Sequence, residues 1–184
     1  GVSDLTPVKQ QIDLLLKLKP DAKNVGLAYC SNEVNSEIQI QMAKDYLDSL
    51  GIGYTVATAV TTNDITQTLT VLSEKVDSVY IPVDNAFASA MPTVMNVCSA
   101  KKLPVIVGAL AMVEEGALGS CGFDYYDCGV QCGKLAAKVL NGADPAETPV
   151  EFVTETFTSI NKTYADSIGI EISDEILNSA KEVY

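Results

Sequence analysis

The stretch NVGLAYCSNEVNS at residues 24–36 decides the fold. After Asn24, residues 25–30 form a continuous apolar run, which predicts a buried strand over 24–30. A short polar loop follows, and Ser36 with Gln39 has the spacing of a capping box, which predicts a helix that Gly51 ends. A buried strand that leads through a polar loop into a helix is the repeating unit of open parallel sheets.

The same unit recurs along the chain. A first helix is expected where Thr6 can act as the N-cap and Pro7 as the first helical residue. Further apolar runs predict strands over 54–60, 78–83, 104–107, 117–123 and 150–157, with helices over 64–75, 85–100, 127–141, 161–168 and 173–183. The spacing of the strand starts suits right-handed crossovers. The sequence therefore predicts an α/β fold with an open, mostly parallel sheet and helices on both faces.

Composition excludes several classes of function. The 184 residues include 12 basic and 24 acidic side chains, for a net charge of −12, and no His. Binding to nucleic acid is not expected, because neutralising phosphates needs clustered Lys and Arg. His is the commonest general base and zinc ligand in proteins, and this chain has none. A hydrophobic content of 47% excludes disorder, and no apolar run approaches the ~20 residues of a membrane span.

The five cysteines admit two interpretations. They are Cys30, Cys98, Cys121, Cys128 and Cys132, and the last three form a C-x6-C-x3-C series. A metal site would need a fourth ligand, and no His can supply it. Small buried hydrophobes are the favoured interpretation, and we expect no metal. No cofactor is expected either, since the Gly-rich phosphate-binding fingerprints are absent.

Ligands of such sheets bind outside the carboxyl ends of the strands. After the first strand, Asn35 and Ser36 lie at a helix N-terminus, where exposed N–H groups suit a carboxylate or phosphate. After the third, Asp84 could hold a ligand ammonium, with Asn85 beside it. For Ser36 and for Asp84 the alternative is an ordinary helix N-cap.

Two more loops belong to this edge of the sheet. The loop 108–110 is apolar, and the stretch FDYYD places Asp124 and Asp127 around two tyrosines. Tyr125 and its neighbour could line a ligand slot, although one of them could equally lie in the core. None of these loops contains His, Lys or Arg to activate a nucleophile, so we expect a binding protein for a zwitterion and not an enzyme.

Four motifs carry a resemblance to a known family. They are GVSDL at 1–5, Tyr29 followed by Asn35-Ser36, VYIPVDN at 79–85, and GFDYYD-x-G-x-x-x-GK-x-A at 122–136. Over essentially its whole length the chain resembles the substrate-binding proteins of ABC transporters that include tryptophan- and tyrosine-binding members. Members resemble type I periplasmic binding proteins, in which two α/β lobes close on a ligand around a hinge.

The resemblance implies a domain organisation. Residues 1–123 resemble the C-terminal ligand-binding lobe, and residues 124–158 the segment that crosses the hinge and would complete an N-terminal lobe. Residues 159–184 resemble the C-terminal return. The family is longer than this chain, so the sequence is interpreted as a fragment. The unpartnered helix over 127–141 would leave Val130, Leu135, Val139 and Leu140 exposed, and we expect a homodimer or larger assembly in consequence.

The resemblance also implies function. Asn35 and Ser36 would take the carboxylate of the ligand, Asp84 and Asn85 match the strand-end pair of the family, and Asp124 stands at a hinge-side contact. The sequence departs from the family at Val83 and over 108–110, where apolar residues replace polar ones and suit an aromatic or branched amino acid. We therefore expect an extracytoplasmic, periplasmic or lipid-anchored component of an amino-acid importer that meets an ABC permease. The alternative is the effector-sensing domain of a cytoplasmic regulator with the same fold.

Overall fold

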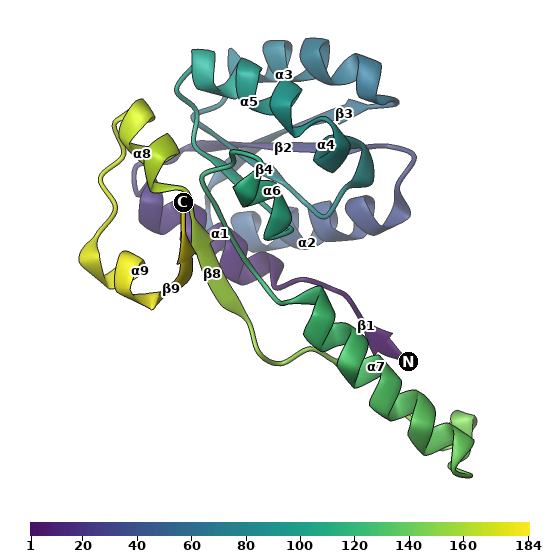
Figure 1. Cartoon of the computed structure of the whole chain (residues 1–184). Helices are drawn as coiled ribbons and strands as arrows, with labels where there is room; N and C mark the ends of the chain where they lie inside the picture. Colours follow the sequence, from purple (N-terminus) through teal and green to yellow (C-terminus); the bar gives the residue numbers. More distant parts are fainter.

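The computed structural model describes all residues from 1 to 184 and contains one large sheet (Figure 1). Seven strands lie in the order β3-β2-β4-β5-β6-β8-β9. Neighbouring strands run parallel except for β6 and β8, which are antiparallel. The strands of this sheet are β2 (Asn24–Cys30), β3 (Gly53–Ala59), β4 (Ser78–Ile81), β5 (Val105–Val107), β6 (Gly119–Gly122), β8 (Phe157–Ile160) and β9 (Ala180–Val183). The predicted open, mostly parallel α/β sheet is confirmed.

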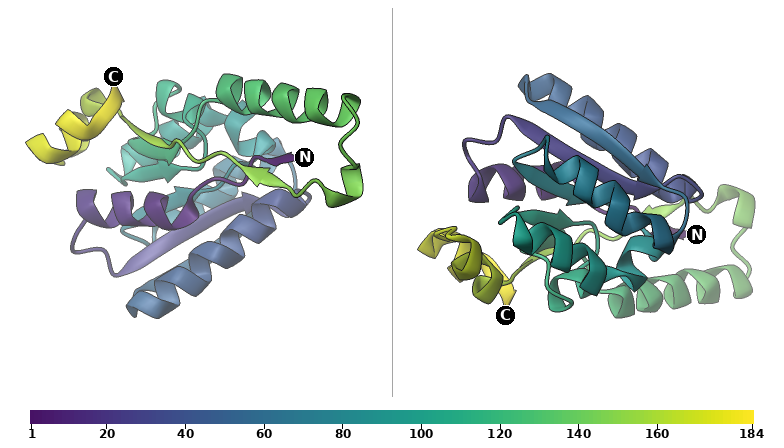
Figure 2. Two further views of the ribbon diagram at one scale, coloured as in Figure 1. Left: turned by 90° about the horizontal axis from the view of Figure 1, so that it is seen from below. Right: turned by 90° about the horizontal axis from the view of Figure 1, so that it is seen from above.

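Helices cover both faces of the sheet, as Figures 1 and 2 show. One face carries α1 (Val8–Leu18) and α2 (Val34–Leu50). The other carries η1 (Thr62–Asp64), α3 (Ile65–Ser73), α4 (Asn85–Ser89), α5 (Met91–Ala100) and α6 (Ala111–Glu114). At the β8–β9 side lie α8 (Lys162–Ile168) and α9 (Asp174–Ser179). A single cluster of buried apolar residues joins these layers, because strands covered on both faces can bury every side chain.

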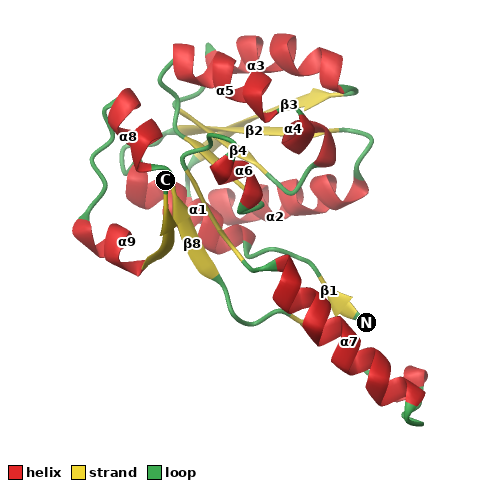
Figure 3. Cartoon of the chain, in the orientation of Figure 1, coloured by secondary structure: helices red, strands yellow, loops and turns green.

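A separate arm projects from the sheet (Figures 1 and 3). It consists of α7 (Tyr125–Leu140), η2 (Pro145–Glu147) and the parallel pair β1 (Val2–Ser3) and β7 (Glu151–Phe152). The prediction that the helix would expose its apolar residues holds only in part. Leu140 is 87% and Val130 39% exposed, but Leu135 is buried because α7 packs against β1.

Several predicted elements have different bounds. The helix expected over 85–100 breaks at Ala90 into α4 and α5, with Pro92 in the first turn of α5, where no helical N–H is needed. The strand expected over 150–157 becomes two short strands, β7 and β8. The last expected helix ends at Ser179, and the final residues instead pair with β8 as β9. Gly51, in the left-handed conformation at φ 69°, ends α2 as predicted.

Gln11 of α1 ties three strand ends together. Its side chain is fully buried, and its Nε2 donates to the carbonyl oxygens of Gly108, at 3.1 Å, and Cys121, at 2.7 Å. Its Oε1 accepts from the hydroxyl of Tyr80 at 2.7 Å. Burial raises the pKa of that hydroxyl, so Tyr80 stays a donor. One amide thus fixes the carboxyl ends of β4, β5 and β6 against α1.

We expect Gln11→Leu to lower the free energy of unfolding by about 3 kcal/mol, because it leaves the Tyr80 hydroxyl and two buried carbonyls without their partner. Urea denaturation measures the loss. Gln67→Leu, at an exposed position of α3, is the control and should change stability by less than about 0.5 kcal/mol. Equal effects of the two substitutions would contradict a structural role for Gln11.

Candidate functional site

A cavity of about 740 Å³ lies at the carboxyl ends of β2 and β4, where the segment after β1 and the start of α7 meet the sheet. Three of the predicted site residues line it, namely Asn35, Asn85 and Tyr125. The remaining lining residues are Ser3, Asp4, Leu5, Ile38, Gln39 and Val83. No Lys or Arg is among them, so the only formal charge on the wall is the carboxylate of Asp4.

The loop after β4 forms one wall, and side chains of α2 hold it. The last pairing of β4 with β5 joins Ile81 to Val107, so the sheet offers Val83 no partner. The carbonyl of Val83 accepts from Asn35 Nδ2 at 2.9 Å and from the Ser36 hydroxyl at 3.1 Å. Its N–H donates to Gln39 Oε1 at 3.2 Å. Both polar groups of the Val83 backbone are therefore satisfied by the first two turns of one helix.

Gly108 permits a close approach behind this loop. A Cβ at this position would lie 2.3 Å from the N of Val83 and 2.5 Å from the C of Pro82.

The predicted apolar loop 108–110 does not line the main cavity. Ala109 and Leu110 instead line a second cavity of about 270 Å³, which also contains Asp124 and shares Tyr125 with the first.

Ser36 is fully buried and lies in the first turn of α2, not at its N-cap. The predicted capping box with Gln39 is wrong, because α2 begins at Val34, and Glu33, three residues before Ser36, occupies the N-cap position. The side chain of Glu33 makes no capping bond to α2, and the N–H groups of Val34 and Asn35 have no partner within the chain. The helix therefore presents free backbone donors beside the cavity.

Thr6, the other expected N-cap, is buried and donates its hydroxyl to Gln39 at 3.1 Å.

Asp84 is 1% exposed and is not on the cavity wall. Its Oδ1 accepts from the N–H of Phe87 at 3.0 Å as the N-cap of α4, and its Oδ2 accepts from the N–H of Cys30 at 2.7 Å. Burial raises the pKa of this carboxyl, although the two backbone donors oppose the shift. These contacts favour the N-cap alternative, in which Asp84 joins the end of β2 to the start of α4.

Glu33 also supports the start of α4. Its carboxylate accepts from the N–H groups of Asn85 and Ala86 and from Asn85 Nδ2, each at 2.9 Å. Partial burial pushes the pKa of Glu33 upward, but these hydrogen bonds outweigh it and leave the pKa below its ordinary value. The Asn85 amide is thereby oriented with its donor side toward Glu33.

Asp124 caps α7 by accepting from the N–H of Tyr126 at 2.8 Å, and α7 begins at Tyr125 rather than near Asp127 as predicted. Tyr125 is 51% exposed. Burial, and then the charge of Asp4, raise the pKa of its hydroxyl. Tyr125 stacks in a tilted geometry on Phe123, with ring centroids 5.4 Å apart. Tyr125 thus lines both cavities at the junction of the sheet and the arm.

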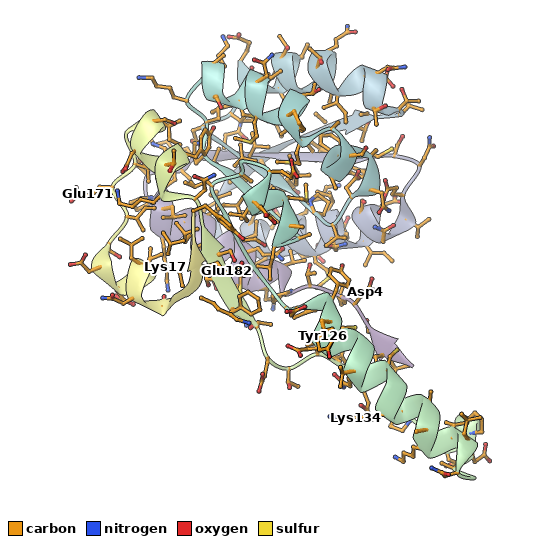
Figure 4. The ribbon with its side chains drawn as sticks, viewed as in Figure 1. Asp4, Lys17, Tyr126, Lys134, Glu171 and Glu182 are labelled. Atoms are coloured by element: carbon orange, nitrogen blue, oxygen red, sulfur yellow. The ribbon has the colours of Figure 1, made fainter.

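Reasoning from the sequence missed several residues of this wall, and Asp4 and Gln39 are the two that matter most for the site. Asp4 lies in the segment after β1, close to the start of α7 in Figure 4, and Gln39 lies one turn into α2. Asp4 belongs to the GVSDL motif, so the motif was a signal that this carboxylate had a role. Gln39 had been assigned to a capping box, and its true partners Thr6 and Val83 are distant in sequence.

Solved structures with similar folds identify the architecture as that of type I periplasmic binding proteins. An ABC domain from Streptococcus pneumoniae in complex with L-Trp matches with a TM-score of 0.92 and 40% identity, over 100% of this chain and 62% of that one. A conserved domain protein from Vibrio cholerae matches at 0.93 and 34% identity, over 100% and 62%. Matches below 25% identity include transcriptional regulators and show the fold alone.

The family model for ABC transporter substrate binding proteins matches residues 1–184. The chain is also 35% identical to a tyrosine-binding protein of Clostridioides difficile over 191 residues, which is 98% of this chain and 55% of that protein. The chain therefore belongs to the ABC transporter substrate binding protein family and spans about half the length of the curated relatives it matches. The alternative of a regulator is not favoured, because only matches below 25% identity are transcriptional regulators.

We expect Gly108→Ala to lower the free energy of unfolding by about 1–3 kcal/mol, because the new methyl group overlaps backbone that cannot move without breaking the bonds of Val83. Gly129→Ala is the control, since that position in α7 has nothing within 4 Å and a helical Ala is favoured by about 0.5–1 kcal/mol. Urea denaturation of both variants checks the contrast. A stable Gly108→Ala variant would show that the loop has room to shift.

The depressed pKa of Glu33 predicts a pH dependence. Because the folded state favours the carboxylate, its contribution is fully present above the ordinary glutamate pKa of about 4.3 and is lost as the pH falls through the lowered value. Glu33→Gln should cost about 1 kcal/mol at pH 7 and nothing in strong acid. Thermal melts of the variant and the parent from pH 7 to pH 3 measure the difference. A difference between variant and parent that is the same at pH 7 and at pH 3 would contradict this role of Glu33.

Proposed function

We propose that the chain is the ligand-binding part of a solute-binding protein of an ABC importer and that its ligand is an aromatic or large apolar amino acid. The observation that carries the proposal is the start of α2, where Asn35, whose N–H has no partner, lines a cavity of about 740 Å³ that also contains one carboxylate and one aromatic ring. A helix N-terminus suits an anion, and a carboxylate suits an ammonium group. A cavity that offers both suits a zwitterion.

The ligand carboxylate is placed at the N–H groups of Val34 and Asn35, with Asn85 beside them. Family resemblance assigned this role to Asn35 and Ser36. We keep Asn35 in contact with the ligand through its backbone, while the buried Ser36 acts from behind by holding Val83. The 17-residue length of α2 supports the site, because its aligned peptide dipoles leave partial positive charge at this end.

The ligand ammonium is placed at Asp4. This carboxylate is exposed on the cavity wall, whereas that of Asp84 is occupied by two backbone donors. The net charge of −12 also favours a ligand group that carries positive charge. The apolar part of the ligand would lie against Leu5, Ile38 and Tyr125, which are 40%, 53% and 51% exposed. The relatives described as tyrosine-binding and as an L-Trp complex support an aromatic ligand.

A second lobe would cover the cavity in this proposal. Residues 1–123 form the ligand-binding lobe, residues 124–158 cross to the other lobe as the arm, and residues 159–184 return to the sheet. The arm carries an apolar groove of about 460 Å³ between α7 and the chain near Pro145, which a second lobe or a second copy of the chain would fill. The importer role implies that the protein meets an ABC permease. It also implies that the protein lies outside the cytoplasm, with or without a lipid anchor. No helix has the length and apolar character needed to cross a membrane.

Titration by NMR tests the ligand. We expect L-tryptophan and L-tyrosine to shift the amide signals of residues 33–36 and 83–85 in the 184-residue chain, with weak affinity because one lobe cannot enclose them. D-galactose should leave these signals unchanged. Shifts with the sugar and none with any amino acid would overturn the proposal.

A pair of acid-to-amide substitutions tests the position of the ammonium. Asp4→Asn should weaken binding about tenfold and leave the thermal midpoint unchanged, because it removes the charge partner on the wall. Asp84→Asn should lower stability by about 1–3 kcal/mol, since an amide cannot accept from both Cys30 and Phe87. Loss of affinity in Asp84→Asn alone, with an unchanged midpoint, would restore Asp84 as the ammonium partner.

A further inference from the structure

Gln39 makes more contacts than the hydrogen bonding of the Val83 backbone requires of it. Its side chain is 4% exposed and joins three segments that are distant in sequence. Oε1 accepts from the hydroxyl of Thr6 at 3.1 Å and from the N–H of Val83 at 3.2 Å, while Nε2 donates to the carbonyl of Asn35 at 3.1 Å. Every polar atom of the amide is therefore engaged.

Each partner of Gln39 lies at the cavity wall. Val83 and Asn35 line the cavity, and Thr6 follows the lining residue Leu5 in the segment that leads from the arm into α1. Thr6 is 4% exposed, so water cannot replace it as a donor to Gln39. The orientation of the Gln39 amide is thus set on one side by the segment from the arm, and on the other by the loop after β4.

We propose that Gln39 is a positioning residue that couples the segment arriving from the arm to the ligand-binding wall. The hydroxyl of Thr6 fixes the amide of Gln39, the amide fixes the N–H of Val83, and the carbonyl of Val83 in turn orients the side chains of Asn35 and Ser36. A displacement of the segment between β1 and α1 would release this chain of bonds and loosen the wall. The coupling itself is independent of the proposed function. Only its expected effect on ligand affinity rests on that function.

Hydrogen exchange at single amides tests the coupling without a ligand. In Thr6→Val, which keeps the shape and removes the donor, we expect exchange of the Val83 N–H to accelerate about tenfold. Exchange of the Cys30 N–H should stay unchanged, because Asp84 and not Gln39 holds it. Thr6→Ser, which restores a hydroxyl, should return Val83 to the rate of the parent chain.

Tyr164→Phe is the matched control. It removes one buried hydrogen bond, from the Tyr164 hydroxyl to the carbonyl of Leu103 at 2.7 Å, at the opposite end of the sheet. We expect it to lower the thermal midpoint about as much as Thr6→Val and to leave the ratio of the Val83 and Cys30 exchange rates unchanged. An unchanged Val83 rate in Thr6→Val, or equal acceleration at Cys30, would overturn the coupling.

A titration with L-tryptophan separates this inference from the proposed function. If the chain binds L-tryptophan, Thr6→Val should weaken the affinity about threefold to fivefold, and Thr6→Ser and Tyr164→Phe should not. Equal weakening by Tyr164→Phe would reduce Gln39 to a structural role. If neither the parent nor any variant binds an amino acid, the proposed function fails, and the exchange rates of Val83 still decide the coupling.

Discussion

The backbone that leaves β4 must be hydrogen-bonded without help from the sheet. The ladder with β5 ends at Ile81, Pro82 has no N–H, and the chain then passes within contact of Gly108 on its way to α4. Buried backbone groups without partners are strongly destabilising, so side chains must take over. Those of Asn35, Ser36 and Gln39 do so from α2. The start of α2 is consequently fixed to the loop after β4, and Asn35 at this start lines the cavity.

The acidic residues around the cavity divide into two kinds. Glu33 and Asp84 accept hydrogen bonds from backbone N–H groups at the start of α4, and these bonds hold the chain in place there. Asp124 is engaged in the same way by the N–H of Tyr126 at the start of α7, whereas Asp4 is exposed and lines the cavity. A carboxylate that is already saturated with donors contributes little to an incoming ammonium, because its lone pairs are occupied. Counting acidic residues at strand ends therefore overstates how many are free for a ligand.

Much of the fold could be predicted because its strands are buried on both faces. After a polar first residue in β2 and β4, the runs that became β2, β4 and β5 are apolar, and this pattern is strong over short windows. The strand β9 could not be predicted, because its residues, AKEV, are half exposed and are held only by pairing with β8. A local pattern carries no information about such a distant partner.

For the site, too, a local sequence pattern could not reveal contacts with residues that are distant in sequence. Asn35, Asn85 and Tyr125 were found from their places after strands, because parallel strands end at one edge of the sheet. The direction of each side chain was not predictable. Ser36 and Asp84 turn inward because their partners, the carbonyl of Val83 and the N–H of Cys30, lie in the loop after β4 and at the end of β2. Asp4 was overlooked because it precedes the first helix and follows no strand of the main sheet.

The arm has a consequence for how the molecule assembles. Its parallel pair joins Val2 to Glu151 and Ser3 to Phe152, so two residues near the start of the chain meet two that follow strands β2 to β6 in sequence. Closing so long a loop for so few hydrogen bonds is entropically unfavourable. The pair should therefore form only after the sheet has brought β6 and α1 together, and it should be the first contact to open. A protease that cleaves near η2 would then act on molecules whose sheet is still intact, and the arm would mark the boundary between two cooperative units.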